Sequence, residues 1–332
     1  MKVLVTGGGG FLGGAICRML REQGVEVRSF SRQRYEALDS LGVEQHEGDL
    51  ASKQAVFRAV DGVDEVYHVA AKAGAWGDYE SFYRPNVLGT QQIIEACRAH
   101  GVRRLIYTSS PSVVFNGQDM EGVDESVPYP DRYHANYPRT KAEAERLVID
   151  ANGDDLCTIS LRPHLIWGPE DTNLVPRILQ RGSKGQLVKI RGPEKLIDVV
   201  YIDDAAQAHL LAADALRRSP DKVAGKVYFI SSGEPVETWT MIDSILAAGG
   251  LPPVSRSAPL PVASFAGWCF ETFYRLLGKK EEPRLTRWVV HELATAHWFD
   301  ISAARRDLGY NPKVSLDEGL EKLKTWLDAK GC

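Results

Sequence analysis

The sequence of 332 residues lacks several features that mark particular classes of protein. It has only five cysteines, which are scattered and form no C-x-x-C pair, so a disulfide-stapled fold is not expected and a reduced cytoplasm is the expected setting. The first apolar run covers only residues 3–5, which is too short for a signal peptide. No G-x-S-x-G motif occurs, so hydrolase chemistry has little support.

Charge and histidine patterns exclude two further kinds of partner. The net charge is −4 with both signs interspersed, so we expect neither nucleic acid nor an anionic membrane to bind through charge. His291 and Glu292 are similar to the start of a zinc-protease motif, but the next histidine is His297, off the same helix face. We therefore expect no metal site.

A run of glycines organises the start of the chain. Residues 2–5 are typical of a buried strand, and residues 11–20 show helical spacing of apolar side chains. A helix N-terminus that follows such a turn can receive a phosphate. Gly7 would permit the turn, Gly10 would let the backbone approach a pyrophosphate, and Gly13 would allow close helix packing. A turn used only for packing is the alternative, but the context favours a dinucleotide site formed by Gly7, Gly10, Phe11, Leu12 and Gly13.

The end of the second strand predicts which dinucleotide binds. No acidic residue follows the strand expected at 25–30, where Ser31, Arg32 and Arg34 stand instead. In dinucleotide folds an acidic residue here binds the ribose 2′-hydroxyl, whereas an arginine accommodates a 2′-phosphate. The sequence therefore predicts NADP(H), with NAD(H) as the second choice and a solvated basic loop as the non-functional alternative.

Two more strand ends supply candidate cofactor contacts. Asp49 and Leu50 follow a weak strand at 43–46, where Asp49 could accept a hydrogen bond from an adenine amino group or could cap a helix at 51–60. Ala70, Ala71 and Lys72 follow the strand at 66–70 and begin a loop of small residues. Such a loop lets a flat cofactor lie against the backbone.

Strands and helices alternate through the first half of the chain. Further helices are expected at 86–100 and 138–150, strands at 104–108 and 158–161, and a polar loop at 116–136. This alternation predicts an α/β fold with a Rossmann-type, doubly wound parallel sheet that binds ligands at its carboxyl edge. We assign 1–165 and the returning segment 198–234 to an NAD(P)-binding domain, and 166–197 and 235–332 to a smaller, mostly helical substrate-binding portion. Asp203 or Asp204 is expected to cap a helix at 205–217.

A proton-transfer group is predicted next to this edge. Tyr137 and Lys141 lie four residues apart at the start of a helix, so they share one face. A nearby ammonium lowers the pKa of a phenol toward neutral pH, and a strand-end hydroxyl, Ser110, can hold a substrate oxygen beside it. An exposed helix pair is the alternative for an isolated Y-x-x-x-K. Because this pair follows a glycine-rich nucleotide loop in the same chain, a chance occurrence of the motif is a poor explanation.

Taken together, these pieces resemble the extended short-chain dehydrogenase/reductase family. The matching stretches are TGGGGFLG at the start, GDL at 48–50, HVAA at 68–71, PNVLGT at 85–90, YTSS at 107–110, the Tyr137–Lys141 pair, LRPHLIWGP at 161–169, VVYIDDAAQAH at 199–209 and DLGYNPKVSLDEGL at 307–320. The 3β-hydroxysteroid dehydrogenase branch is the most similar. Within it, AAKAGAWG at 70–77 and YTSSPSV at 107–113 most resemble bacterial 2-alkyl-3-ketoalkanoic acid reductases. Trp167 replaces the family's usual tyrosine.

The resemblance implies a role for each matching position. Tyr137 would be the general acid/base, Lys141 would bind the nicotinamide ribose, and Ser110, or Ser109 if the register differs by one, would orient the substrate oxygen. Pro163 and Leu165 would border the nicotinamide. Trp76 and His164 are further candidates for substrate contacts.

The implied reaction interconverts a secondary alcohol and a ketone on a lipophilic substrate, with NADP(H). A 2-alkyl-3-oxoalkanoic acid reduced to its 3-hydroxy acid is the first expectation, and Lys72, Arg177 or Arg284 could pair with its carboxylate. A 3β-hydroxysteroid or sterol-4-carboxylate 3-dehydrogenase is the alternative. A nucleotide-sugar epimerase or dehydratase, or a non-catalytic nucleotide sensor, has less support. The family also implies a homodimer through the helices at 86–100 and 138–150.

One apolar stretch stands apart from this scheme. Residues 259–277 (PLPVASFAGWCFETFYRLL) are the most aromatic part of the chain and are at the short end for a bilayer span. A helix that covers the substrate cleft or packs on a partner subunit is favoured. An interfacial membrane contact is the alternative.

Overall fold

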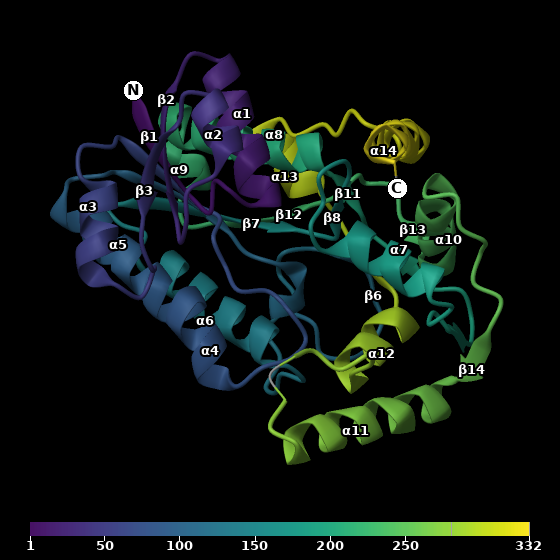
Figure 1. Cartoon of the computed structure of the whole chain (residues 1–332). Helices are drawn as coiled ribbons and strands as arrows, with labels where there is room; N and C mark the ends of the chain where they lie inside the picture. Colours follow the sequence, from purple (N-terminus) through teal and green to yellow (C-terminus); the bar gives the residue numbers. More distant parts are fainter. Residues whose placement is uncertain (280, 332) are drawn as a thin grey trace.

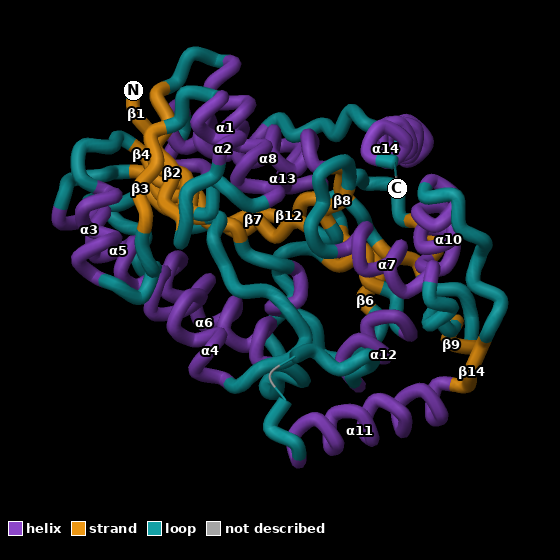
Figure 2. The backbone as a smooth tube through the Cα atoms, in the orientation of Figure 1, coloured by secondary structure: helices purple, strands orange, loops and turns teal. Residues whose placement is uncertain are grey.

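A seven-stranded parallel sheet lies at the centre of the computed structural model, which describes residues 1–279 and 281–331 (Figure 1, Figure 2). Its strand order is β12-β7-β5-β4-β1-β2-β3. The strands are β1 (Lys2–Thr6), β2 (Glu26–Ser31), β3 (Glu44–Glu47), β4 (Glu65–His68), β5 (Arg104–Thr108), β7 (Cys157–Pro163) and β12 (Val227–Ile230). The predicted Rossmann-type fold is confirmed, and so is the strand that returns to the sheet after residue 226.

The order of the strands reverses between β1 and β4, and this reversal positions the site. The middle of β1, from Val3 to Val5, is completely buried, because its apolar side chains meet helices on both faces. Val3 lies between Val27 of β2 and Glu65 of β4 in the parallel register. The loops that leave β1 and β4 run to opposite sides, so a crevice opens at their carboxyl ends.

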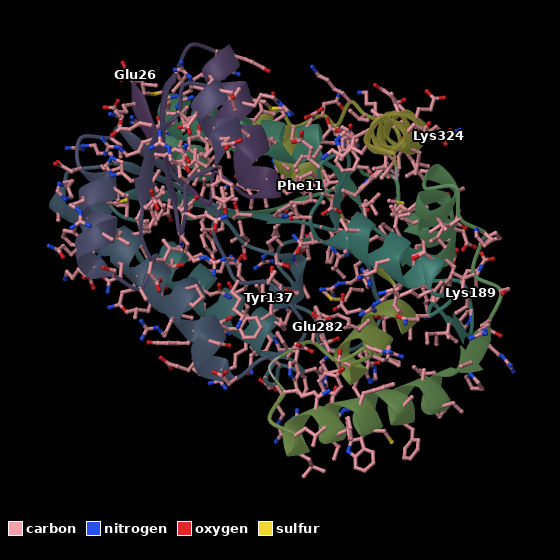
Figure 3. All side chains as sticks on the ribbon, viewed as in Figure 1. Phe11, Glu26, Tyr137, Lys189, Glu282 and Lys324 are labelled. Atoms are coloured by element: carbon pink, nitrogen blue, oxygen red, sulfur yellow. The ribbon has the colours of Figure 1, made fainter. Side chains whose placement is uncertain are left out.

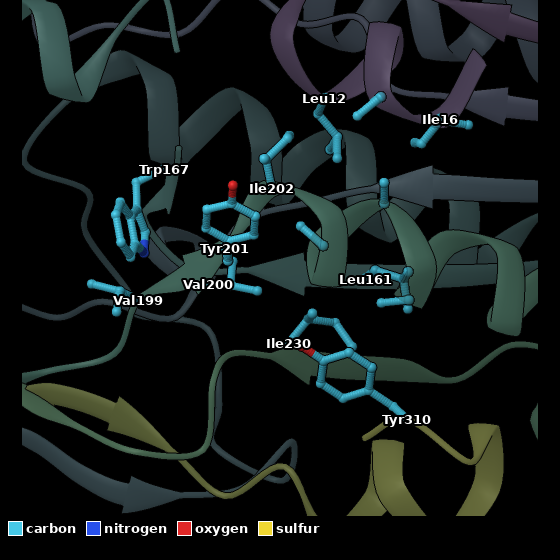
Figure 4. Close-up of a cluster of buried hydrophobic side chains, with 14 of the residues drawn as sticks. Leu12, Ile16, Leu161, Trp167, Val199, Val200, Tyr201, Ile202, Ile230 and Tyr310 are labelled. Atoms are coloured by element: carbon cyan, nitrogen blue, oxygen red, sulfur yellow. The ribbon is translucent and has the colours of Figure 1, made fainter. Parts of the chain in front are cut away.

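Helices cover the two faces of the sheet. One face carries α1 (Phe11–Glu22), α8 (Ile202–Arg218) and α13 (Ser302–Leu308), and the other carries α3 (Lys53–Val60), α5 (Gly89–Ala99) and α6 (Asn136–Asp150). The close-up in Figure 4 shows part of the first of these interfaces, where Leu12 and Ile16 of α1 belong to the same buried cluster as Ile202 and Leu161. Short helices α2 (Glu36–Ser40), α4 (Tyr79–Tyr83) and α9 (Pro220–Val223), a π-helical turn (Arg84–Leu88) and a 3-10 turn (Pro111–Val113) complete this part.

The remaining elements pack beside the sheet near its carboxyl edge. They are the helices α7 (Leu174–Ser183), α10 (Thr238–Ala248), α11 (Leu260–Leu276), α12 (Arg287–Ala294) and α14 (Leu316–Lys330), and the strands β6 (Met120–Val123), β8 (Ile166–Trp167), β9 (Lys189–Arg191), β10 (Leu196–Ile197), β11 (Val200–Tyr201), β13 (Val236–Glu237), β14 (Ser257–Pro259) and β15 (His297–Phe299). Strand β6 lies inside the predicted polar loop. It forms because β15, far along the chain, pairs with it in parallel.

Two predictions of helix caps are wrong. Helix α3 begins at Lys53 and is capped by Ser52, whose hydroxyl accepts from the Ala55 amide at 3.4 Å, rather than by Asp49. Asp203 and Asp204 lie inside the first turn of α8 and do not cap it. Their carboxylates bind elsewhere, because Asp203 pairs with Arg18 and Asp204 accepts from two backbone amides at 313 and 314.

Cys17, Cys97, Cys157 and Cys269 are free thiols, and Cys332 lies outside the described residues. The apolar stretch forms α11, which lies at the edge of the molecule (Figure 1). In the described ranges, no helix has both the length and the apolar character needed to cross a membrane.

Candidate active site

A cavity of about 990 Å³ occupies the crevice at the carboxyl edge of the sheet. It gathers strand ends from the sheet and side chains from α12 and β15. Every residue predicted to contact the cofactor lines this cavity, namely Gly7, Gly10, Phe11, Leu12, Gly13, Ser31, Arg32, Asp49, Leu50, Ala70, Ala71, Lys72, Tyr137, Lys141, Pro163 and Leu165. Ser110, Ser109 and His164 line it as well. Two of these lining residues, Phe11 and Tyr137, are labelled in Figure 3.

The glycine loop has room for a ligand but not for side chains. Gly7 has a φ of 72°, and its amide donates to the Phe30 carbonyl at 2.8 Å, which fixes the turn after β1. A Cβ on Gly13 would lie 2.2 Å from the Gly7 carbonyl oxygen, so only glycine fits there. Gly10 caps α1 without any side chain, which leaves the first helix amides available to an anion. These features fit the pyrophosphate of a dinucleotide.

The loop after β4 is fixed by a hydrogen-bond network around Thr6. The Thr6 hydroxyl accepts from the amides of Val69 and Ala70, each at 3.1 Å. It donates to His68 Nδ1 at 2.8 Å, because His68 Nε2 donates to Thr90, whose own proton goes to a backbone carbonyl. Burial lowers the pKa of His68 to about 3, so the imidazole stays neutral and keeps this arrangement. The network therefore holds the backbone of Val69 and Ala70 in place at the wall of the cavity.

Asn86 fixes the next residue of this loop. Its Oδ1 accepts from the Lys72 amide at 2.7 Å, and its Nδ2 donates to the Lys72 carbonyl at 3.0 Å and to Thr140 Oγ1 at 3.1 Å. One amide side chain therefore joins the β4 loop to α6. Asn86 belongs to the quoted PNVLGT stretch, but nothing in the local pattern predicted this bracing role. The Lys72 ammonium donates to Ser81 Oγ at 2.8 Å.

The two arginines after β2 have different environments. Arg34 forms a bidentate pair with Asp39, with N···O distances of 2.7 and 3.1 Å, and does not line the cavity. Arg32 is exposed, lines the cavity and forms no ion pair within residues 1–279 and 281–331. Arg32 is therefore the guanidinium available to a ligand at this end. Asp49 also lines the cavity, although one of its oxygens accepts from the Ala51 amide at 2.9 Å.

Tyr137 projects from the first turn of α6 toward Ser110. Burial raises the pKa of the Tyr137 phenol, the Ser110 hydroxyl that hydrogen-bonds it lowers that pKa, and Glu292 raises it. The sequence predicted that the pKa of Tyr137 is lowered, whereas in the folded chain it is raised. Ser110 Oγ also lies 2.9 Å from Ser112 Oγ. Ser109 is buried and its hydroxyl has no hydrogen-bond partner within the described chain, whereas the Ser110 hydroxyl bonds Tyr137, which favours Ser110 for the predicted role.

Lys141 lies one turn below Tyr137 and is buried. Its Nζ donates to the Thr108 carbonyl at 2.6 Å and lies 4.2 Å from the centre of the Tyr107 ring. Burial lowers the pKa of Lys141 to about 7, and Glu145, one turn further along α6, opposes that shift. The carbonyl at the end of β5 therefore holds the Lys141 side chain in place.

An ion pair under Lys141 fixes the direction of α6. Glu145 and Arg162 are both buried and form two hydrogen bonds, of 2.7 and 3.0 Å. The Tyr129 hydroxyl donates to Glu145 at 2.6 Å. Because a buried pair is stable only with such additional hydrogen bonds, this cluster keeps α6 aligned with β7. It therefore positions Lys141 and Tyr137.

Four side chains from the C-terminal portion complete the cavity, and the sequence did not predict them. They are Trp288, Glu292, His297 and Phe299. His297 Nε2 donates to the Glu292 backbone carbonyl at 2.9 Å, so its Nδ1 accepts from His164 Nε2 at 2.6 Å. The Glu292 carboxylate forms no ion pair or hydrogen bond in the described part of the chain, and burial raises its pKa to about 7. Only the tertiary fold brings these residues to Tyr137.

Trp76 does not line the cavity that holds Tyr137, and its predicted contact with the substrate stays a prediction. It lines a second cavity, of about 1210 Å³, where its Nε1 donates to the Lys279 carbonyl at 3.2 Å and its ring meets Tyr274 edge-on. The loop 71–78 turns outward after Lys72, which carries Trp76 toward α11. Lys72, Ser81 and Trp288 line both cavities, so the two are adjacent.

Comparison with known proteins identifies the chain. The family model for the 3-beta hydroxysteroid dehydrogenase/isomerase family matches residues 4–262. A 2-alkyl-3-oxoalkanoate reductase from Shewanella oneidensis is 48% identical, over 97% of this chain and 85% of the relative. A decarboxylating sterol-4-alpha-carboxylate 3-dehydrogenase from Mus musculus is 33% identical, over 97% of this chain and 89% of the relative. The solved structure of MoeE5 in complex with UDP-glucose and NAD has a TM-score of 0.76, with 25% identity over the whole of both chains. The chain therefore belongs to the 3-beta hydroxysteroid dehydrogenase/isomerase family and is an oxidoreductase that acts on CH–OH groups.

Proposed function

We propose that the protein reduces a 2-alkyl-3-oxoalkanoic acid to its 3-hydroxy acid with NADPH. The observation that carries this proposal is one cavity that joins the glycine loop to Tyr137, Lys141 and Ser110. The similarity to a 2-alkyl-3-oxoalkanoate reductase supports the substrate class. Arg32 at the adenosine end of the cavity, and the absence of an acidic residue directly after β2, support NADPH as the cofactor.

The cofactor would lie along the carboxyl edge of the sheet. The amides of Gly10, Phe11 and Leu12 would bind the pyrophosphate, and Arg32 would pair with a 2′-phosphate. Ala70, Ala71, Pro163 and Leu165 would flank the nicotinamide ring. When bound, the nicotinamide supplies the hydride that the ketone carbon accepts.

The chain's own groups would handle the proton. Tyr137 donates its phenolic proton to the carbonyl oxygen as the alcohol forms, and Ser110 holds that oxygen beside the phenol. Lys141, anchored by the Thr108 carbonyl, places its positive charge below the phenolate that remains and stabilises it. The hydrogen bond from Ser110 already favours the phenolate.

Lys72 is our candidate for the substrate carboxylate. Of the three cations considered, Arg177 forms a bidentate pair with Glu282, at 3.0 and 3.1 Å, and Arg284 lines neither cavity. Lys72 lines both cavities and makes no ion pair within residues 1–279 and 281–331. The uncharged form of Glu292, which its raised pKa favours below neutral pH, would tolerate a nearby carboxylate.

A sterol 3-dehydrogenase is the second candidate. The substrate in the name of the Mus musculus relative, a sterol 4-carboxylate that reacts at position 3, has a carboxylate and a reacting 3-position, as a 2-alkyl-3-oxo acid does. The absence of an acidic residue after β2 argues against an NAD-retaining epimerase. A homodimer through α5 and α6, the assignment of domains and a cytoplasmic location stay predictions.

The test is cofactor oxidation, followed by nicotinamide absorbance, with a 2-alkyl-3-oxo acid and with a 3-ketosteroid. Both NADPH and NADH would be offered, and Tyr137→Phe would serve as the control for turnover. Turnover of the oxo acid with NADPH is expected. Turnover of the ketosteroid alone would move the assignment to sterol chemistry. Binding of NADPH without turnover of either substrate would refute the proposed reaction.

A further inference from the structure

Lys72 places a positive charge at the wall of the cavity that holds Tyr137. Its side chain is half-buried, and its Nζ donates to Ser81 Oγ at 2.8 Å and lies 4.6 Å from the centre of the Phe82 ring. The Ser81 hydroxyl donates in turn to the Asp78 carbonyl at 2.8 Å, so these contacts give Lys72 neutral partners only. A half-buried ammonium with neutral partners can form a charge-assisted hydrogen bond with an anion that enters the cavity.

The position of this charge is fixed by the chain around it. Asn86 bonds both the amide and the carbonyl of Lys72, at 2.7 and 3.0 Å. On the other side, Gly77 has a φ of 140°, and a Cβ there would lie 2.9 Å from the Phe82 ring and 3.5 Å from Lys72 Nζ. The loop 71–78 therefore packs closely on the ammonium and confines it beside α4.

The other lysines and arginines of this cavity lie where the cofactor is expected. Within the described chain they are Arg32, Arg84 and Lys141. Arg32 is at the adenosine end, and Lys141 is held by a backbone carbonyl below Tyr137. Arg84 begins the π-helical turn before α5, whose first residue packs against Leu50, a predicted cofactor contact. Lys72 is therefore the cation that remains for a substrate carboxylate.

The wall formed by α12 offers no positive charge to that carboxylate. It contributes Trp288 and Glu292 to the cavity, one aromatic and the other acidic. Helix α12 is held against α11, because Glu271 accepts from the Arg287 amide at 2.8 Å and from its guanidinium at 2.9 Å. A Cβ on Gly267 would lie 3.0 Å from the same amide nitrogen, so the two helices are in close contact. Without Lys72, a carboxylate in this cavity would be buried and unpaired, which is unfavourable.

A 2-alkyl-3-oxo acid has two reactions open to it at such a site. Hydride transfer to C3 gives the 3-hydroxy acid. In the other reaction the bond between C1 and C2 breaks, CO₂ leaves, and the electron pair forms the C2–C3 double bond of an enol, whose oxygen takes the Tyr137 proton. Water then protonates C2 and the enol proton returns to Tyr137. The net change converts the oxo acid anion and one proton to a ketone and CO₂, with no oxidant or reductant.

The two reactions differ at the carboxylate. Both place negative charge on the ketone oxygen, so Tyr137 and Ser110 assist both. The charge of the carboxylate stays in place during hydride transfer but moves away from it during the loss of CO₂. A cation bound to the carboxylate therefore stabilises the starting anion more than the transition state for CO₂ loss, and slows that reaction selectively.

We propose that Lys72 pairs with the substrate carboxylate and thereby suppresses a latent decarboxylase activity of the same site, which commits the 3-oxo acid to reduction. This inference rests on the proposed function, because it concerns the substrate named there. It makes Lys72 a determinant of which product forms, in addition to its part in binding.

Release of ketone in the presence of NADP⁺ tests the proposal, because NADP⁺ has no hydride to give. The full chain, in excess over a 2-alkyl-3-oxo acid, would be incubated with NADP⁺, and ketone would be measured by gas chromatography beside a sample without protein. We expect the unaltered protein to release ketone no faster than buffer. Lys72→Met should release it about tenfold or more faster than buffer, since one hydrogen bond to a charged group is lost.

Four further variants make the result specific. Lys72→Arg keeps the charge and should behave like the unaltered protein. Lys279→Met removes a cation that lines only the second cavity, where its Nζ lies 5.1 Å from the centre of the Tyr274 ring, and should also release no extra ketone. Lys72→Met/Tyr137→Phe should lose the extra release. Release at the buffer rate in Lys72→Met would overturn the proposal, and so would extra release from Arg84→Met instead.

Reactions with NADPH separate this inference from the proposed function. Absence of 3-hydroxy acid with the unaltered protein would refute the proposed function and the inference with it. With the reduction intact, Lys72→Met should lower the ratio of hydroxy acid to ketone by about tenfold or more, after subtraction of the ketone formed in buffer. An unchanged ratio would refute the inference alone.

Discussion

Arg32→Ala gives the most direct test of how the adenosine end of the cavity works. Arg32 lines the cavity and makes no ion pair in the part of the chain that the structure describes, so its guanidinium is free to meet a 2′-phosphate. NADH has a hydroxyl at that position and offers no charge. The substitution should therefore affect NADPH alone.

The size of the effect follows from the position of the side chain. A hydrogen bond to a charged group contributes about 1.5–3 kcal/mol, and 1.4 kcal/mol corresponds to a tenfold change. Arg32 is exposed, so solvent screening places the contribution near the lower end of that range. We expect kcat/KM for NADPH to fall about ten- to thirtyfold, with kcat/KM for NADH changing by about twofold or less.

The chain offers a matched control two residues further on. Arg34 has the same charge but is paired with Asp39 and does not line the cavity, so Arg34→Ala should leave both cofactors nearly unaffected. Initial rates with each cofactor would be compared for the unaltered protein and the two variants. Equal losses for NADPH and NADH in Arg32→Ala, or the larger loss in Arg34→Ala, would refute the assignment of the 2′-phosphate.

Three further predictions concern the other end of the cavity. Tyr137→Phe should lower kcat about 10²–10⁴-fold while fluorescence titration shows NADPH binding nearly unchanged; unaltered turnover would remove Tyr137 from the mechanism. As the pH rises through about 7, Glu292 ionises, raises the pKa of Tyr137 and repels an anionic substrate, so kcat/KM should fall. Glu292→Gln should weaken that limb and leave the part that comes from Lys141, whose pKa is also about 7, and superimposable profiles would contradict the role of Glu292. Glu145→Ala should lower the free energy of unfolding by about 3–5 kcal/mol in denaturant titration, since it leaves the buried Arg162 unpaired; a loss below about 1 kcal/mol would count against it.

The parts of the site that depend on local geometry could be predicted from the sequence. The glycine spacing followed from the turn between β1 and α1, and the positive φ of Gly7 and the tight contact at Gly13 agree with it. The four-residue spacing of Tyr137 and Lys141 places both on one face of α6. Because parallel strands end at the same edge, the residues after each strand converge without further information.

The remaining parts depend on contacts between distant segments. Glu292 and His297 reach the cavity because β15 pairs with β6, and no local pattern announces that pairing. Asp204 misled the prediction of a cap for the same reason, since its amide partners are more than one hundred residues away. The direction of the pKa shift of Tyr137 also escaped prediction, because burial of the phenol is a property of the folded chain.

The attachment of α11 to α12 has a mechanical consequence. Glu271 and the close contact at Gly267 couple the two helices, and α12 carries Trp288 and Glu292 into the wall of the cavity. A displacement of α11 would therefore be transmitted through α12 to the cavity wall that Trp288 and Glu292 form. Substitutions along α11 could in this way adjust substrate fit at a distance and leave the proton-transfer group untouched.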